Sequence, residues 1–183
     1  KGTPLSGLGA MFVARAAQST YSATLLASHG FNGDAMSVGR TITELAIDYR
    51  YIALKPDERI KKFKEFDSVA IYKIAAAADK LHGGRFDPDM MRTLKEHRDE
   101  AKKNNPESTT NWAGVRLSER AKIVDESNPT LKRMSLYKLG YADACNASHS
   151  GFLTLQYALE GQGAGAVIRM GPMAPAFKPI DLA

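Results

Sequence analysis

Residues 56–84, PDERIKKFKEFDSVAIYKIAAAADKLHGG, decide the fold class of this chain. The stretch opens with the acidic pair Asp57 and Glu58, which suits the positive end of a helix dipole. Apolar residues then recur at intervals of three and four, as on one face of a helix, and the glycines at 83 and 84 stop the run. These apolar residues are Phe63, Phe66, Ala70, Ile74, Ala77 and Leu81. The pattern predicts one long helix whose apolar face lies in the core.

Helix-breaking residues divide the rest of the chain into similar pieces. Proline and small polar residues mark helix starts, and glycine or a following proline marks helix ends. The expected helices run from Pro4 or Ser6 to Ser28, from Asn32 or Asp34 to about Leu54, from Asp87 to Lys103, over a short stretch from Ser118, and from Asn128 to about Ser150. The chain shows neither an internal repeat nor an alternating strand pattern. We therefore predict an all-α fold, a bundle of five to six helices.

A single domain fits the size and composition of the chain. Its 183 residues are 44% hydrophobic and 25% charged, which is enough to bury one core. We expect this helical-bundle domain to span residues 1–160, with FLTLQYALE at 152–160 as a candidate short helix. Residues 161–183 are rich in glycine and proline, and we expect them to form an irregular tail that can lead into further chain.

Charge and cysteine content narrow the classes of partner and compartment. The net charge of +5 is compatible with an acidic partner such as RNA, but 25 basic against 20 acidic residues excludes a protein that coats nucleic acid by charge alone. A single cysteine cannot form an internal disulfide, so we expect a cytoplasmic protein. The most apolar run, 9–27, is interrupted by polar residues and predicts no membrane span. A homodimer or a larger protein assembly is compatible with the sequence.

The helix expected at 32–54 carries two stripes on opposite sides. One consists of Val38, Ile42, Leu45, Tyr49 and Ile52, and the other of Arg40, Glu44, Ile47 and Tyr51. Arg40 and Glu44 lie four residues apart, so they can form an ion pair on the helix surface. In one interpretation this is a solvated pair of little energetic weight. In the other the stripe faces a polar cleft, where Arg40 holds an anion and Glu44 orients it.

A row of four residues runs along the late helix in YKLGYADACNASH, residues 137–149. Tyr137, Tyr141, Cys145 and His149 follow one another at four-residue intervals, so they share one apolar face of a helix. The tyrosines are expected to bury their rings, and Cys145 to act as a small hydrophobe. His149 lies in the last turn, where the negative helix end favours its protonated form. It is either a structural cap or a group that transfers a proton.

Two other patterns compete with this site. Arg92 and His97 form an R-x4-H spacing that resembles the catalytic signature of HEPN-type ribonucleases, with Thr93 where Asn, Asp or His usually follows the arginine. A metal site would need several converging ligands. Glu44, Asp48 and His149 could supply three ligands, but the Glu-x-x-His pairs of carboxylate-bridged bundles are missing. We expect neither a metal nor a cofactor.

Two segments together resemble the bacterial domain-of-unknown-function family 5677. RTITELAIDYRYIALKPDERIKKFKEF, residues 40–66, is similar to the family's R-x3-E helix, YI pair and R-x3-F segment. NWAGVRLSERA, residues 111–121, followed by YKLGYADACNASH, is similar to its tryptophan loop and its Y-x3-Y-x3-S-x3-H helix. The resemblance implies a helical bundle and no particular activity. Members look like the helical proteins of bacterial conflict and phage-defence settings.

The resemblance also implies a set of polar site residues. These are Arg40, Glu44, Trp112, Tyr137, Tyr141 and His149. Cys145 stands where the family usually has serine, which favours a packing role at that position.

Two hypotheses follow for the function. In the first, the chain is a metal-independent ribonuclease-like or nucleotide-acting enzyme, a phosphodiester hydrolase of a defence or toxin system. Its expected catalytic residues are Arg40, Glu44, Tyr141 and His149, and its expected binding residues are Tyr51, Trp112 and Tyr137. In the second, the chain is a non-catalytic helical module that binds an anionic small molecule, a nucleic acid or a protein partner.

Overall fold

The computed structural model describes residues 3–108, 110–128, 137–141, 145, 159–160 and 167–168. The chain divides into two compact units, one formed by residues 1–51 and 121–183 and the other by residues 52–120. None of the helices in these described ranges combines the length and the hydropathy that a membrane span requires.

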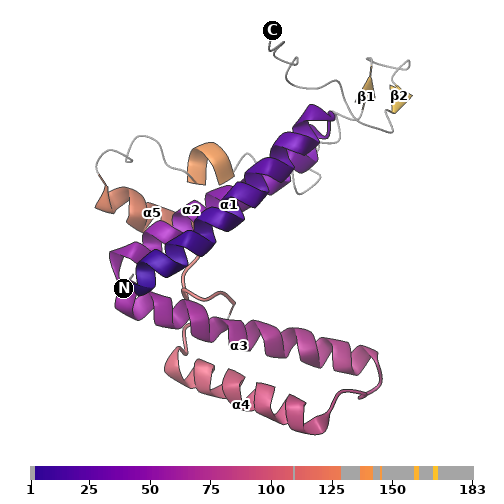
Figure 1. Ribbon diagram of the computed structural model, residues 1–183, viewed down its shortest axis with the longest axis vertical. Coiled ribbons are helices and arrows are strands. Elements are labelled where there is room, and N and C mark those ends of the chain that lie inside the picture. Colours follow the sequence, from indigo (N-terminus) through magenta and orange to yellow (C-terminus); the bar gives the residue numbers. More distant parts are fainter. Residues whose placement is uncertain are drawn as a thin grey trace. The chain divides into compact units, whose positions relative to one another are not determined.

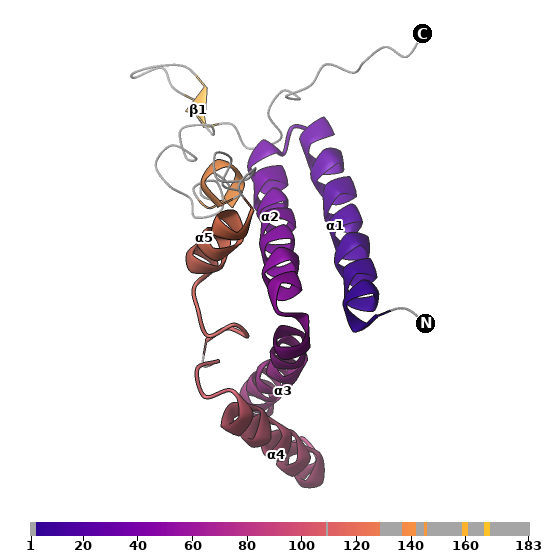
Figure 2. The same cartoon turned by 90° about the vertical axis from the view of Figure 1, so that its left-hand side faces the viewer.

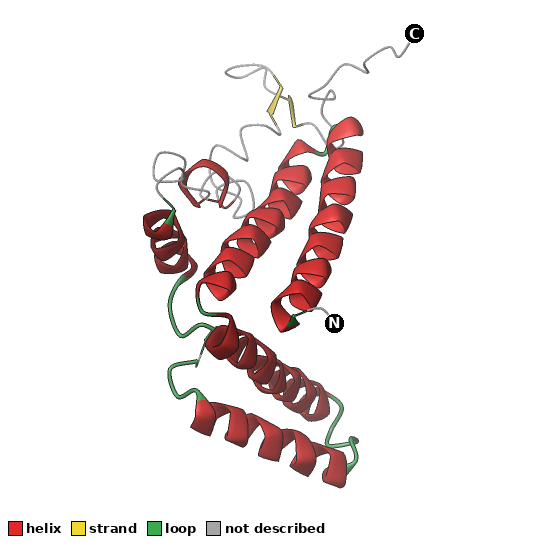
Figure 3. Cartoon of the chain, turned by 60° about the vertical axis from the view of Figure 1, so that its left-hand side comes forward, coloured by secondary structure: helices red, strands yellow, loops and turns green. Residues whose placement is uncertain are grey.

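The architecture is all-α, as the sequence predicted (Figure 1). The helices are α1 Pro4–Ser28, α2 Asn32–Leu54, α3 Pro56–Leu81, α4 Pro88–Asn104 and α5 Leu117–Ser127, drawn in red in Figure 3. Two very short strands, β1 Leu159–Glu160 and β2 Val167–Ile168, pair antiparallel. Leu159 and Glu160 are therefore extended rather than helical, and Val167–Ile168 form a strand within the tail that was predicted to be irregular. The other residues of the predicted short helix and tail lie outside the described residues.

In the first unit, α1 and α2 form an antiparallel pair joined by a short turn (Figure 2). Thr3 caps α1, because its side chain accepts a hydrogen bond from the Ser6 backbone amide at 3.2 Å. The two helices approach closely where Gly9 faces Tyr49: a Cβ atom added at Gly9 would lie 2.8 Å from the Tyr49 hydroxyl. The Phe12 ring lies 5.6 Å from the Tyr49 ring, centroid to centroid. Tyr49 thus fixes the contact between these helices.

In the second unit, α3 and α4 run side by side (Figures 1 and 3). Asp87 caps α4 by accepting a hydrogen bond from the Asp89 amide at 3.0 Å, as the sequence predicted. Across the pair, the Arg98 guanidinium lies 4.1 Å from the centroid of the Tyr72 ring. The Asp79 carboxylate accepts a hydrogen bond from the Phe86 amide at 2.9 Å and so ties the connecting loop to α3.

The predicted core face of α3 is only partly buried. None of its six predicted residues is fully buried: those in the first half of α3 are half-buried, whereas Ile74 and Leu81 have relative exposures of 70% and 82%. The buried apolar residues of α3, Ile60 and Val69, are not among the six. The reason lies within the unit: the loop after α4 covers the first half of α3, where Phe63 contacts the Trp112 ring. A single partner helix covers only a narrow stripe of the second half. The expectation of a continuous core face was therefore wrong at its C-terminal end.

Two further details differ from the predicted helices. Ser118 is the second residue of α5 rather than its cap, because the carbonyl of Arg116 already accepts hydrogen bonds from the amides of Glu119 and Arg120. Of the helix predicted from Asn128 to Ser150, the structure describes Asn128, residues 137–141 and residue 145. Tyr137–Tyr141 forms a π-helical turn instead of an α-helical one.

Candidate functional site

The site begins with an ion pair on α2. The Nε atom of Arg40 donates a hydrogen bond to Oε1 of Glu44 at 3.0 Å. The two side chains are 31% and 35% exposed, so the pair is neither fully solvated nor fully buried. Their spacing of one helical turn makes this geometry available on any helix. What distinguishes this pair is the group that lies on its other side.

That group is Tyr141, whose ring lies against the Arg40 guanidinium. The Arg40 Cζ atom is 5.3 Å from the centroid of the ring, within the range of a cation–π interaction. The Tyr137 ring stacks on the Tyr141 ring at 5.0 Å between centroids, with 24° between the ring planes. The contact thus joins α2 to the π-helical turn, two segments far apart in the sequence. Single π-helical turns occur frequently at functional sites.

The electrostatics of the cluster keep both of its key groups protonated. The hydrogen bond to Glu44 raises the pKa of Arg40, so its guanidinium stays charged. Burial raises the pKa of Tyr141 to about 12, and the hydrogen bond with Cys145 adds to this increase. A hydrogen bond that raises a tyrosine pKa is one that the neutral hydroxyl donates. At neutral pH, Tyr141 is therefore a hydrogen-bond donor and not a base.

The stripe of α2 that carries Arg40 faces inward further along the helix. Ile47 is 1% exposed and Tyr51 is 7% exposed. A helix face that is buried at these positions is not a plain wet surface. The half-buried ion pair therefore fits the interpretation of a polar recess better than that of a fully solvated pair.

Arg40 retains two nitrogens for a ligand. Among the residues that the structure describes, its guanidinium donates a hydrogen bond only through Nε. The two Nη groups, which form the end of the planar fork, match the spacing of two phosphate or carboxylate oxygens. Glu44 and the Tyr141 ring hold the fork in place from two sides. The cluster is thus an oriented guanidinium beside a pair of aromatic rings, an arrangement that is chemically able to hold an anion.

The structure brings together four of the predicted site residues, namely Arg40, Glu44, Tyr137 and Tyr141. His149 lies outside the described residues. Tyr51 is buried on α2, and its predicted binding role stays a prediction.

Cys145 joins this cluster, although the sequence favoured only a packing role for it. Its thiol accepts the hydrogen bond of the Tyr141 hydroxyl. The signal was present in the sequence, because residues four apart on a helix lie side by side and a thiol is a weak acceptor.

Trp112 belongs to the second unit, where it is 6% exposed. Its ring meets the Phe63 ring edge-on at 5.2 Å between centroids, and the Arg120 guanidinium lies 5.4 Å from its centroid. The Ser108 hydroxyl donates a hydrogen bond to the Trp112 carbonyl at 2.8 Å. These contacts hold the loop between α4 and α5 onto α3. The predicted ligand-binding role of Trp112 stays a prediction.

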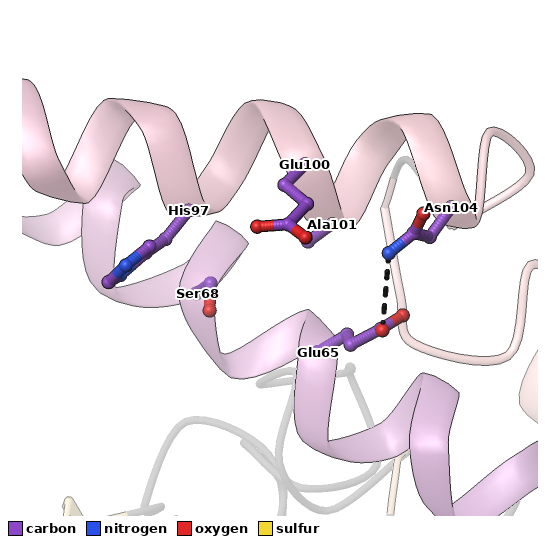
Figure 4. A pocket seen from close by; sticks show the side chains of 6 residues that line it. All are labelled: Glu65, Ser68, His97, Glu100, Ala101 and Asn104. Atoms are coloured by element: carbon purple, nitrogen blue, oxygen red, sulfur yellow. Dashed lines mark hydrogen bonds between the residues drawn. The ribbon is translucent and has the colours of Figure 1, made fainter.

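A second recess lies between α3 and α4 in the second unit (Figure 4). Its volume is about 190 Å³, and its lining residues are Glu65, Ser68, His97, Glu100, Ala101 and Asn104. The amide of Asn104 donates a hydrogen bond to Glu65 at 3.3 Å. Arg92, the partner of His97 in the R-x4-H spacing, is instead paired with Asp89 at 3.0 Å on an exposed surface. The recess therefore holds only one of the two residues of that pattern.

Metal ligands gather neither at the Arg40 cluster nor in the recess between α3 and α4, as far as the described residues go. Within the described part of the chain, no group of three or more His, Cys, Asp or Glu side chains is arranged so that it could hold a metal ion.

Comparison with known proteins gives one match. The sequence model of a family of unknown function, DUF5677, matches residues 8–165. No curated protein and no solved structure shows significant similarity to the chain.

Proposed function

The chain belongs to the DUF5677 family of unknown function, and on that premise we propose that it is an RNA- or nucleotide-acting phosphodiesterase of a bacterial defence or toxin system. The observation that carries the proposal is the Arg40 fork, which Glu44 and the Tyr141 ring hold from two sides. An arginine fixed in this way stabilises the negative charge that develops on a phosphate in the transition state. The mildly basic charge of the chain also favours a polyanionic substrate.

The proposed reaction needs one further group, which moves protons. In RNA, the 2′-hydroxyl loses a proton and attacks the adjacent phosphorus, the bond to the 5′ oxygen breaks, and that oxygen takes up a proton. Because the nucleophile is part of the substrate, these residue types suffice without a metal-bound water. His149 is the proposed proton carrier, since histidine titrates near neutral pH. Tyr141 is the proposed donor to a phosphate oxygen, with its one hydroxyl proton turning from Cys145 to the substrate. Tyr137 is the proposed ring on which a base stacks.

The direct test compares cleavage of single-stranded RNA by the wild-type chain and the variant His149→Ala. We expect this variant to lose at least about 10²-fold in rate, which is the usual contribution of a general acid or base. His97→Ala is the matched control, because His97 is also a histidine of this chain and belongs to the competing R-x4-H pattern. Loss of cleavage in His97→Ala with full cleavage in His149→Ala would refute the proposed site.

The non-catalytic alternative rests on a specific observation, namely that Glu44 already balances the charge of Arg40. A binding module needs only the aromatic pair and the oriented fork. The two functions are separated by measuring both RNA binding and RNA cleavage by the variant Arg40→Lys. Lysine keeps the positive charge but loses the planar fork of the guanidinium. The binding module is favoured over the enzyme if the wild-type chain cleaves no RNA and Arg40→Lys binds RNA more weakly than the wild type.

A further inference from the structure

The outer face of α1 is unusual for a helix in contact with water. Three large apolar residues on it are exposed: Met11 at 69%, Tyr21 at 73% and Leu25 at 49%. Arg15 is the only charged residue in the 25 residues of the helix. A helix with one buried face normally carries charged side chains on the opposite face. Since a quarter of the whole chain is charged, this exposed and almost uncharged face indicates a covered surface.

Exposed side chains of α1 form a stripe along the helix, with small residues in its first half and larger residues in its second half. When each residue turns by about 100°, the exposed residues opposite Leu8, Phe12 and Ser19 form one stripe. Along the stripe stand Ala10, Met11, Ala14, Ala17, Gln18, Tyr21, Thr24 and Leu25. Small residues dominate its first half, and Tyr21 and Leu25 lie in its second half. The spacing of Met11, Ala14, Gln18, Tyr21 and Leu25 alternates three and four, as on helices that pair along their length.

We propose that the partner of this face is α1 of a second copy of the chain, lying antiparallel. A two-fold axis beside Ala17 and Gln18 would place Tyr21 of one copy opposite Ala14 of the other. The same axis places Leu25 opposite Ala10. Large residues then meet small ones at each level, which is the arrangement that fills space between two helices. One surface serves both copies, as in an isologous dimer.

The size of the face agrees with this partner. A helix of 25 residues is about 37 Å long and about 11 Å across, so its outer half presents on the order of 600 Å². Two such faces together give about 1,200 Å², which is the lower limit for specific interfaces. The dimer is therefore expected to dissociate on dilution. Nearly complete lack of charge also argues against a strongly charged partner, such as a nucleic acid, on this face.

The test is the mass of the full chain in solution, measured by sedimentation equilibrium across a wide range of concentration. The wild-type chain should change from dimer to monomer on dilution. Tyr21→Glu places two charges in the interface and should raise the dissociation constant at least about tenfold. Ile74→Glu is the matched control, because Ile74 is 70% exposed on α3 and lies outside the face. Its dissociation constant should equal that of the wild type.

Cysteine cross-linking tests the antiparallel order in the background Cys145→Ser. Gln18→Cys lies next to the axis and should yield a disulfide-linked dimer on oxidation, since Cα atoms must approach within about 7 Å. Ala10→Cys lies about 22 Å from its counterpart in this arrangement and should not cross-link. A monomer at all concentrations, an undiminished dimer in Tyr21→Glu, or efficient cross-linking through Ala10→Cys would each overturn the proposal.

Discussion

Arg40 and Arg120 both lie against aromatic rings, and they differ in what their remaining nitrogens do. Arg120 is 6% exposed beside the Trp112 ring, and its Nη1 atom donates to Oδ1 of Asn111 and to the Val115 carbonyl, both at 3.3 Å. Arg40 is half-buried beside the Tyr141 ring, and its Nη groups donate to none of the described residues. An arginine–aromatic contact thus occurs in two environments.

The comparison separates a structural arginine from a candidate binding arginine. In the loop of the second unit, the guanidinium satisfies buried oxygen atoms and closes the turn around Gly114, which has a φ of +70°. In the first unit, Glu44 fixes the Nε side of the fork and leaves its outer end to a ligand. An arginine–aromatic contact alone therefore says little about function. The role of such an arginine depends on whether its terminal nitrogens already donate hydrogen bonds within the protein.

The largest expected effect in this comparison is that of Trp112→Ala. The ring is buried between Phe63 and Arg120, so its removal leaves a cavity and should lower the free energy of unfolding by about 3–5 kcal/mol. Urea unfolding followed by circular dichroism measures the change. Tyr137→Ala is the control, because Tyr137 is only half-buried and should cost less. Equal losses in the two variants would contradict the structural role of Trp112.

A matched pair of conservative substitutions tests the arginines directly. Arg120→Lys cannot satisfy both oxygen acceptors while stacking on the ring, and should cost about 1–3 kcal/mol of unfolding free energy. Arg40→Lys keeps the charge beside Glu44 in a partly exposed pair and loses only the fork, so it should cost less than about 1 kcal/mol. Its RNA cleavage or RNA binding should fall instead, whereas folded Arg120→Lys should keep both. Thermal and urea unfolding together with the RNA assay measure both effects, and a reversed order would break the comparison.

The smallest expected effect is a change in titration at high pH. Because the folded pKa of Tyr141 is raised to about 12 from its ordinary value of 10, the unfolded chain loses this proton first as the pH rises. The stabilisation due to the neutral hydroxyl is complete below about pH 10 and is lost between about pH 10 and 12. In a pH titration followed by tyrosinate absorbance near 295 nm, the wild-type chain should show one tyrosine that ionises at higher pH than the others. Tyr141→Phe should lack this step. A titration of Tyr141→Phe that matches the wild type would show an ordinary pKa.

The sequence predicted the helices well because their signals are local. Asp87 and the following Pro88 start α4, and the two glycines that follow His82 end α3. These residues act on the adjacent turn of the backbone and need no distant partner. The exposed end of α3 was not predictable in the same way. Periodicity places Ile74 and Leu81 on one face, but whether another segment covers that face depends on the fold.

The candidate site shows the same division. Spacing alone predicts that Arg40 can pair with Glu44 and that Tyr137, Tyr141 and Cys145 share a face, since neighbours on a helix are fixed by its pitch. Only the tertiary structure decides that the Tyr141 ring lies against Arg40, and that Trp112 and Arg120 hold a loop together. Contacts between distant segments depend on the closure of long loops and on complementary shape, which no local pattern encodes. The sequence therefore determined the helices and the residue types of the site. The tertiary structure determined which arginine has terminal nitrogens that donate to none of the described residues.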